Sequence, residues 1–480
     1  MLRTTLFAAA FALAATATSA ATVIIDQGPL AGASANGIDS FKSIPYAAPP
    51  TGDLRWRAPQ TGPRWITPRD ATAFGPICPQ HATEGLIARA NLPQSEDCLT
   101  LNLWTPGGRK LPVMVWIYGG GFTQGGASVP RYDGTALARR GVVLVTFNYR
   151  VGRLGFFPHP ALADADFGLL DQIAALQWVK RNIAAFGGDP GNVTIYGESA
   201  GGVSVDMLMS SPLAKGLFAK AIAESGGLFD PTTKIEDARK GALDFATRLG
   251  AKDVAALRAA SVDAILKADD DDDGPVVDGK AILEDPRDAF AAGHQAKVPY
   301  LTGTNSAEGA MLGTQNADWL TKPLGDRLAA VRKLYDTASD AEFAQLLFND
   351  RFMAGPTDQL ARAAAPRAPA YVYRFGFLNA RAHMRGETGV PHGGEMVFVW
   401  GFGDLAAFAP PQDTAMSDTM QRYWTNFART GDPNGEGLPA WPRFEGAHPQ
   451  TLVIDDKTVP VADFRKAQFD ALSPARTPVP

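Results

Sequence analysis

Two nearly unbroken apolar runs dominate the hydrophobic pattern of the chain, at residues 113–118 and 142–147. Runs of this kind are typical of strands that are buried on both faces of a mostly parallel sheet. Over residues 168–186 the apolar positions recur every three or four residues, which predicts the buried face of a helix. A Gly-Gly pair and Asp189-Pro190 follow directly, so we expect the helix to end there.

The same alternation continues through the middle of the chain. Residues 193–196 predict a short strand, an apolar helix pattern starts at Ala200, and residues 298–303 predict a further strand. Strands that alternate with helices in this way favour an α/β fold, with a mostly parallel central sheet flanked by helices.

Two alanine-rich stretches with a helical pattern interrupt this alternation, around residues 230–267 and 319–348. We interpret them as helical insertions that form a cap on the sheet. The sequence has no internal repeat and no flexible linker, so residues 21–480 are expected to form a single domain. The acidic run at residues 269–273 lacks spaced ligands and predicts a solvated loop in preference to a calcium site.

Residues 1–20 have the pattern of a signal peptide. Arg3 supplies a positive charge, residues 6–15 form a short apolar core, and small residues follow at positions 18–21. The apolar run is too short to cross a bilayer, which disfavours the alternative of a membrane anchor. We therefore expect a secreted or periplasmic protein.

The chain has only two cysteines, Cys78 and Cys98, and export would determine whether they form a disulfide. An oxidising compartment would join them in a disulfide, and two free buried thiols are the alternative.

The composition limits the possible partners. Charged residues make up 20% of the 480 residues and the formal net charge is -5, with no basic block, so no nucleic-acid partner is expected. No second apolar run is long enough to span a membrane. No group of His, Cys and carboxylate residues has ligand spacing, so we expect neither a metal nor a cofactor.

The segment Gly197-Glu-Ser199-Ala-Gly201 has the G-x-S-x-G form of a nucleophile elbow. It lies between a predicted strand and a predicted helix, where a sharp turn needs neighbours that are nearly bare of side chain. The N-terminus of the helix would point at developing negative charge. The pattern predicts Ser199 as a nucleophile, against the alternative of an ordinary strand–helix turn.

A glycine triplet, residues 119–121, follows the first predicted strand. Such a loop can turn backbone N–H groups toward an oxyanion, and we expect the donors to be Gly120, Gly121 and Ala200. A phosphate-binding loop is disfavoured because no Lys-Ser/Thr pair follows the glycines.

Several segments together resemble the type-B carboxylesterase and lipase family, which is related to the cholinesterases. The resemblance covers nearly all of the chain after residue 20, and it implies the α/β-hydrolase fold and ester hydrolysis by a serine. Its motifs are Glu96-Asp-Cys-Leu-Thr-Leu-Asn102, Tyr118-Gly-Gly-Gly-Phe122, Asn148-Tyr-Arg-Val-Gly152, Phe186-Gly-Gly-Asp-Pro-Gly-Asn-Val193, Gly197-Glu-Ser-Ala-Gly-Gly202, Pro275-Val-Val-Asp-Gly279 and Tyr423-Trp-Thr-Asn-Phe-Ala-Arg-Thr-Gly-Asp-Pro-Asn434.

The general base must be one of six histidines. His392 has small neighbours in a loop, and the resemblance places the family's catalytic histidine in a similar setting. A buried structural histidine is the alternative.

The acid lies between Ser199 and His392 if the chain order of α/β-hydrolases holds. Glu308 follows the strand predicted at residues 298–303, on the edge of the sheet where active-site groups gather. The resemblance places the family's acid in a Gly-x-Asn-x-x-Glu-Gly loop, which matches Glu308. Asp278 and Asp285 are the nearest rivals.

Two further residues stand near this constellation. Ser225 resembles a family position that supports the triad through hydrogen bonds, but a buried turn serine is an equal alternative. Glu198, beside the nucleophile, is expected to shape the pocket and not to transfer protons.

These features predict a serine carboxylesterase that forms an acyl-enzyme with small or medium uncharged esters. A serine peptidase or amidase on the same fold is the alternative among enzymes. A non-catalytic binding module is disfavoured because Ser, Glu and His are all present. Related cholinesterases place a cation-binding tryptophan in the loop closed by their first disulfide. Residues 79–97 contain no Trp, Tyr or Phe, although Trp319 or Trp400 could substitute.

Overall fold

A computed structural model describes residues 18–19, 22–81, 90–227, 232–269, 274–313, 317–336 and 339–472 of the chain. Apart from residues 18–19, the predicted signal peptide lies outside the described residues. Most of the acidic run, residues 270–273, lies outside them as well.

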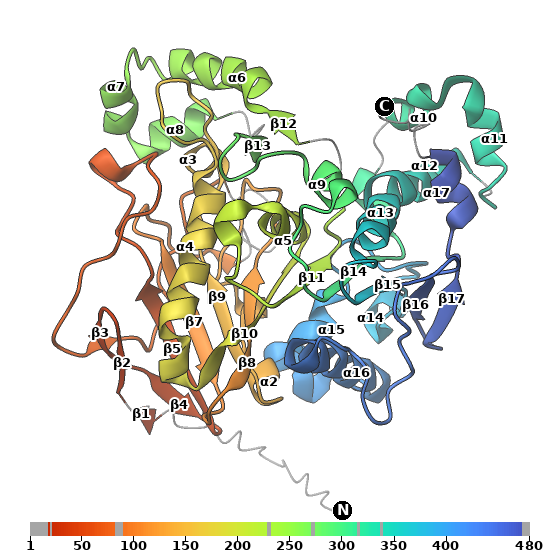
Figure 1. Cartoon of the computed structure of the whole chain (residues 1–480), viewed down its shortest axis with the longest axis horizontal. Coiled ribbons are helices and arrows are strands. Elements are labelled where there is room, and N and C mark those ends of the chain that lie inside the picture. The colour runs from red at the N-terminus through yellow and green to blue at the C-terminus, as the bar shows by residue number, and fades with distance from the viewer. Residues whose placement is uncertain are drawn as a thin grey trace, which may run out of the picture.

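The described strands form one large mixed sheet in the order β1-β4-β5-β7-β9-β8-β10-β11-β14-β15-β16-β17 (Figure 1). Neighbours from β9 to β16 run parallel, and antiparallel strands complete both edges. The bounds are β1 Thr18–Ser19, β4 Ala33–Ala35, β5 Ile38–Pro45, β7 Thr100–Thr105, β8 Leu111–Ile117, β9 Val143–Phe147, β10 Gly188–Glu198, β11 Lys220–Glu224, β14 Tyr300–Asn305, β15 Ala370–Phe375, β16 Gln450–Ile454 and β17 Val459–Ala462. The α/β class and the mostly parallel sheet are therefore confirmed.

Helices pack against this sheet as the periodicity predicted. Helix α4 (Phe167–Asn182) continues into a 3-10 turn and ends at Gly187, whose φ of 84° lies in the left-handed region. Helix α5 (Ala200–Ser210) begins directly behind β10, and α16 (Pro411–Thr430) packs on β8 and β10. Other described helices are α2 Thr135–Ala138, α3 Gly152–Gly155, α9 Pro286–Ala292, α14 Ala380–Met384, α15 Met396–Trp400 and α17 Lys466–Leu472.

Two smaller sheets lie outside the main one. The first joins β2 (Val23–Ile25), β3 (Gly28–Ala31) and β6 (Arg69–Asp70), and the second joins β12 (Thr233–Lys234) to β13 (Val276–Val277).

Strand β10 is longer than the pattern predicted. Its buried part matches residues 193–196, but the strand starts at Gly188, and its pairing with β8 shifts register between Gly188 and Val193. The added residues 188–192 are Gly, Asp, Pro, Gly and Asn, so the apolar pattern does not mark them as strand.

Both predicted insertions are helical, and each has its own apolar core. The first contains α6 (Ile235–Arg248), α7 (Val254–Ala259) and α8 (Val262–Ala268), and it packs around Trp56 and Phe157. The second contains α10 (Asp318–Thr321), α11 (Leu328–Arg332) and α12 (Asp340–Phe348). The two groups occupy opposite upper corners of Figure 1.

The sequence pattern suggested that the second insertion ends at Phe348, but the helical segment extends beyond this residue. The chain continues without a break through a π-helix, Asn349–Ala354, into α13 (Gly355–Ala364). The wider π turn holds the polar residues Asn349 and Asp350 in the interior, where both have hydrogen-bond partners.

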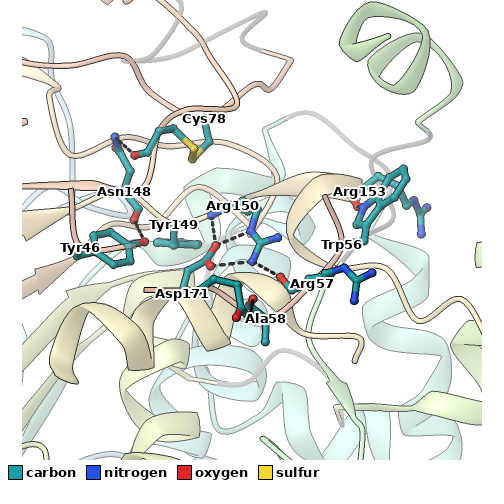
Figure 2. Close-up of polar contacts among 12 residues, drawn as sticks. Tyr46, Trp56, Arg57, Ala58, Cys78, Asn148, Tyr149, Arg150, Arg153 and Asp171 are labelled. Carbon is teal, nitrogen blue, oxygen red and sulfur yellow. Dashed lines mark hydrogen bonds and ion pairs between the residues drawn. A yellow bond between two sulfur atoms is a disulfide. The ribbon is translucent and has the colours of Figure 1, made fainter. Parts of the chain in front are cut away.

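A buried ion pair ties α4 to the segment that follows β9 (Figure 2). The Arg150 guanidinium donates to both oxygens of Asp171 at 2.8 Å, and it also donates to the carbonyl of Arg57 at 3.0 Å. Nearby, the Asn148 side chain donates to the Cys98 carbonyl at 3.0 Å. Removal of one partner from such a pair leaves an uncompensated buried charge and typically costs about 3–5 kcal/mol.

Cys78 and Cys98 are joined in a disulfide, as expected from the sequence. The bridge closes a loop with a sequence separation of 20. In the chain-entropy model, a loop of this size stabilises the folded protein by roughly 3 kcal/mol.

We predict that the double variant Cys78→Ser/Cys98→Ser lowers the free energy of unfolding by roughly 3 kcal/mol in denaturant titrations. The unreduced wild-type protein should have a mass two hydrogens below that of the reduced protein. Two alkylatable thiols in folded, oxidised protein would contradict the bridge.

Candidate active site

Ser199 lies at the tight turn between β10 and α5. Its φ of 59° and ψ of -128° are strained for a residue with a side chain. A Cβ at Gly201 would lie 2.0 Å from the Ile117 carbonyl oxygen, and a Cβ at Gly202 would lie 2.7 Å from that of Glu224. Only glycine fits these two positions, which explains why the motif surrounds the serine with bare backbone.

The structure brings Ser199, His392 and Glu308 together from three separate segments. His392 lies in the loop before α15, and Glu308 starts the 3-10 turn that follows β14. The distance from His392 Nε2 to Ser199 Oγ is 2.7 Å, and that from His392 Nδ1 to Glu308 Oε2 is 2.6 Å. The imidazole thus has a hydroxyl on one nitrogen and a carboxylate on the other.

The Glu308 carboxylate is fully buried and well supplied with donors. Its Oε1 accepts hydrogen bonds from Ser225 Oγ at 2.6 Å and from the Asn305 N–H at 2.7 Å. Burial acts to raise the pKa of Glu308, but the charge of His392 and these hydrogen bonds outweigh it, so the pKa lies below its ordinary value. Glu308 also donates its own N–H to Asn349 Oδ1 at 3.2 Å.

Two carboxylates act on His392. Glu198 Oε1 lies 3.2 Å from Nε2, and Glu308 lies beside Nδ1. Burial acts to lower the pKa of His392, but the charges of Glu198 and Glu308 raise it above its ordinary value. Burial in turn raises the pKa of Glu198.

Sequence reasoning missed two more buried carboxylates near the triad. Glu395 accepts a hydrogen bond from the Asn305 side chain, and Glu224 accepts one from Trp424 Nε1 at 2.9 Å. Burial raises the pKa of both. Glu395 follows His392 by three positions, which was the one available signal, whereas nothing in the sequence marks Asn349.

The glycine triplet lies against Ser199. A Cβ at Gly119 would lie 2.9 Å from Ser199 Cβ, and Gly120 and Gly121 have φ values of 108° and 64°. Among the described residues, no protein acceptor takes the backbone N–H groups of Gly120, Gly121 or Ala200. These three groups are therefore available to an oxygen atom of a bound molecule.

The rival acids have other tasks. Asp278 accepts three backbone N–H bonds from residues 280–282, and Asp285 caps α9 and pairs with Arg287 at 3.0 Å. Within the part of the chain that the structure describes, no cluster of His, Cys, Asp or Glu could hold a metal ion. No described helix is long and apolar enough to cross a membrane.

Comparisons with known proteins identify the family of the chain. The family model described as "Carboxylesterase family" matches residues 19–472. The fumonisin B1 esterase of Sphingopyxis macrogoltabida is 37% identical over 453 residues, covering 85% of this chain and 82% of that protein. The para-nitrobenzyl esterase of Bacillus subtilis is 36% identical, covering 95% of this chain and 99% of its own. A solved PNB esterase structure superimposes with a TM-score of 0.86 at 35% identity, over 95% of this chain and 99% of that one. The chain therefore belongs to the carboxylesterase family, on the α/β-hydrolase fold, and is a carboxylic ester hydrolase.

Proposed function

We propose that Ser199 is the nucleophile, His392 the general base and Glu308 the acid of a two-step ester hydrolysis. The observation that carries this proposal is the unbroken hydrogen-bonded chain from Glu308 through His392 to Ser199 Oγ. In this arrangement the carboxylate fixes the tautomer of the imidazole and stabilises its protonated form.

In the first step, Ser199 Oγ attacks the ester carbonyl carbon while its proton moves to His392 Nε2. The oxyanion accepts hydrogen bonds from the N–H groups of Gly120, Gly121 and Ala200. The ester C–O bond then breaks, the imidazolium returns the proton to the leaving alcohol, and the acyl group stays on the serine. Water, activated by His392, releases the carboxylic acid by the same sequence.

Two neighbouring groups support this chemistry without taking part in proton transfer. Ser225 Oγ donates to Glu308 Oε1, and this bond keeps the other carboxylate oxygen, Oε2, facing His392. Glu198 adds negative charge beside the imidazole, 3.2 Å from its Nε2.

We propose small or medium uncharged esters as the substrates. The loop closed by the disulfide has no Trp, Tyr or Phe in its sequence, although residues 82–89 lie outside the described part. Trp400 is buried under Trp116, Tyr132 and Tyr196, so its faces are not available to a cation. The relative named para-nitrobenzyl esterase is consistent with an uncharged alcohol part.

We also propose that residues 1–20 direct export and are removed, leaving residues 21–480 as one domain that carries both insertions. The disulfide supports an oxidising compartment. Sequencing of the N-terminus of the exported protein tests this assignment.

We predict that Ser199→Ala and His392→Ala each lower kcat by roughly 10⁶-fold, because either change removes the nucleophilic unit. Glu308→Gln should lower kcat by roughly 10⁴-fold and leave the fold intact, because orientation and charge balance are lost. The measurements are kcat on a nitrophenyl ester and circular dichroism.

Asp278→Asn and Asp285→Asn are the matched controls. Near wild-type activity in Glu308→Gln, with loss in either control, would contradict the acid assignment. An organophosphonate should label Ser199 in the wild-type protein, as read by peptide mass, and an absence of label would contradict the serine mechanism.

We predict that Glu198→Gln moves the acidic limb of the pH profile of kcat/KM to lower pH. Burial lowers the pKa of His392, and the charge of Glu198 is the largest single cause that raises it, followed by the charge and the hydrogen bond of Glu308. Loss of that charge lowers the pKa, so the imidazole stays neutral, and able to accept a proton, at more acidic pH. Glu284→Gln, beside the exposed His294, is the control and should not move the profile. A shift to higher pH would contradict the role of Glu198.

We predict a preference for neutral esters over choline esters. An aromatic face contributes up to about 2 kcal/mol to binding a desolvated cation, or roughly 30-fold in affinity. The test compares kcat/KM for butyrylcholine with that for a neutral butyrate ester whose leaving group has a similar pKa. A higher value for butyrylcholine would overturn the proposed substrate class.

A further inference from the structure

Gln80 is a buried glutamine in the segment closed by the disulfide, and the ester chemistry derived above does not use it. Its side chain makes two hydrogen bonds to Gly125, in the loop that follows β8 and contains the glycine triplet (the glycine loop). Nε2 donates to the Gly125 carbonyl at 2.7 Å, and Oε1 accepts from the Gly125 N–H at 2.7 Å. Nε2 also donates to the Cys78 carbonyl at 2.9 Å, so the amide has a partner for each of its polar atoms.

Gly125 directly follows the turn that contains Gly120 and Gly121. The loop closes on itself through the Gly120 carbonyl, which accepts from the N–H groups of Thr123 and Gln124 at 3.2 and 3.1 Å. Gly125 has a φ of 139°, and a Cβ there would lie 2.2 Å from the Tyr118 ring. The position of Gly125 therefore sets the position of the turn that contains Gly120 and Gly121.

The other end of the loop is held separately. Tyr118 stacks on Tyr149 with ring centroids 4.3 Å apart, and each hydroxyl donates to the other residue's carbonyl. Two residues beyond Gly125, the Ala127 N–H donates to Asn148 Oδ1 at 2.9 Å, and the Asn148 amide donates to the Cys98 carbonyl. The backbone carbonyls of Cys78 and Cys98 thus accept hydrogen bonds from Gln80 and Asn148, the two side chains that hold the loop.

We propose that Gln80 is a positioning residue for the oxyanion-binding N–H groups, acting through Gly125, and that the disulfide holds Gln80 in place for this task. The proposal rests on the role proposed above for Gly120 and Gly121. Oxyanion donors must lie about 2.7–3.1 Å from the oxygen in the transition state. A misplacement of about 1 Å costs roughly 100-fold in rate, so a side chain that fixes the loop affects the transition state more than the bound substrate.

The test is Gln80→Met, which keeps the length of the side chain and removes both bonds to Gly125. We expect kcat to fall by about 30- to 100-fold with KM little changed. Affinity for a trifluoromethyl ketone, which adds to Ser199 and forms an oxyanion, should fall by a similar factor. Affinity for the product alcohol, which forms no oxyanion, should not change. If Gln80 had only a structural role, Gln80→Met would change the affinities for the ketone and for the alcohol by a similar factor.

Gln60→Met is the matched control, because Gln60 is exposed and its side-chain amide donates to the nearby Ala58 carbonyl. Gln80→Glu is the second variant, since it keeps the acceptor for the Gly125 N–H and loses both donors. Unchanged kcat and ketone affinity in folded Gln80→Met would overturn the proposal. So would a failure of both Gln80 variants to fold, because the residue would then be needed for folding alone. Absence of Ser199 labelling in the wild-type protein would instead overturn the proposed function.

Discussion

The backbone of Ser199 is the constraint on which the rest of the structure depends. A serine at positive φ persists only where its surroundings fix it. Here the Ser199 N–H donates to the Glu224 carbonyl at 2.9 Å, and the neighbouring glycines press against β8 and β11 with no room for a Cβ. The parallel strands, in the buried centre of the molecule, therefore fix the strained backbone conformation of this turn.

Buried charge is the second cost that the fold must offset. Glu198, Glu224, Glu308 and Glu395 all lie in the interior. The charges of Glu198, Glu308 and Glu395 act on the His392 imidazole. Only Glu308 has a lowered pKa, because it alone has the imidazole and two further donors on its oxygens. The environment thus separates one carboxylate whose pKa is lowered from three whose pKa values are raised.

Local chemistry made much of the fold and site predictable from the sequence. The buried strands β8 and β9, helix α4 and the elbow at Ser199 each follow from a short pattern, and chain order then narrowed the choice of acid to a region that contains Glu308. Asn349, Glu224 and Gln80 escaped prediction because their partners lie far away in the sequence and no local pattern marks such contacts. The π-helix escaped because its apolar spacing resembles that of the helices on either side.

The separate core of the second insertion has a consequence for thermal inactivation. The 3-10 turn that starts at Glu308 ends at Leu312, and Leu312 packs in that peripheral core with Phe348 and Phe352. Asn349, whose Oδ1 accepts a hydrogen bond from the Glu308 N–H, lies between these two phenylalanines in the sequence. Small peripheral cores open at lower free energy than a central sheet. Local opening of this core would displace Glu308, the proposed acid, while the sheet stays folded, so heat would abolish turnover before the bulk of the molecule melts.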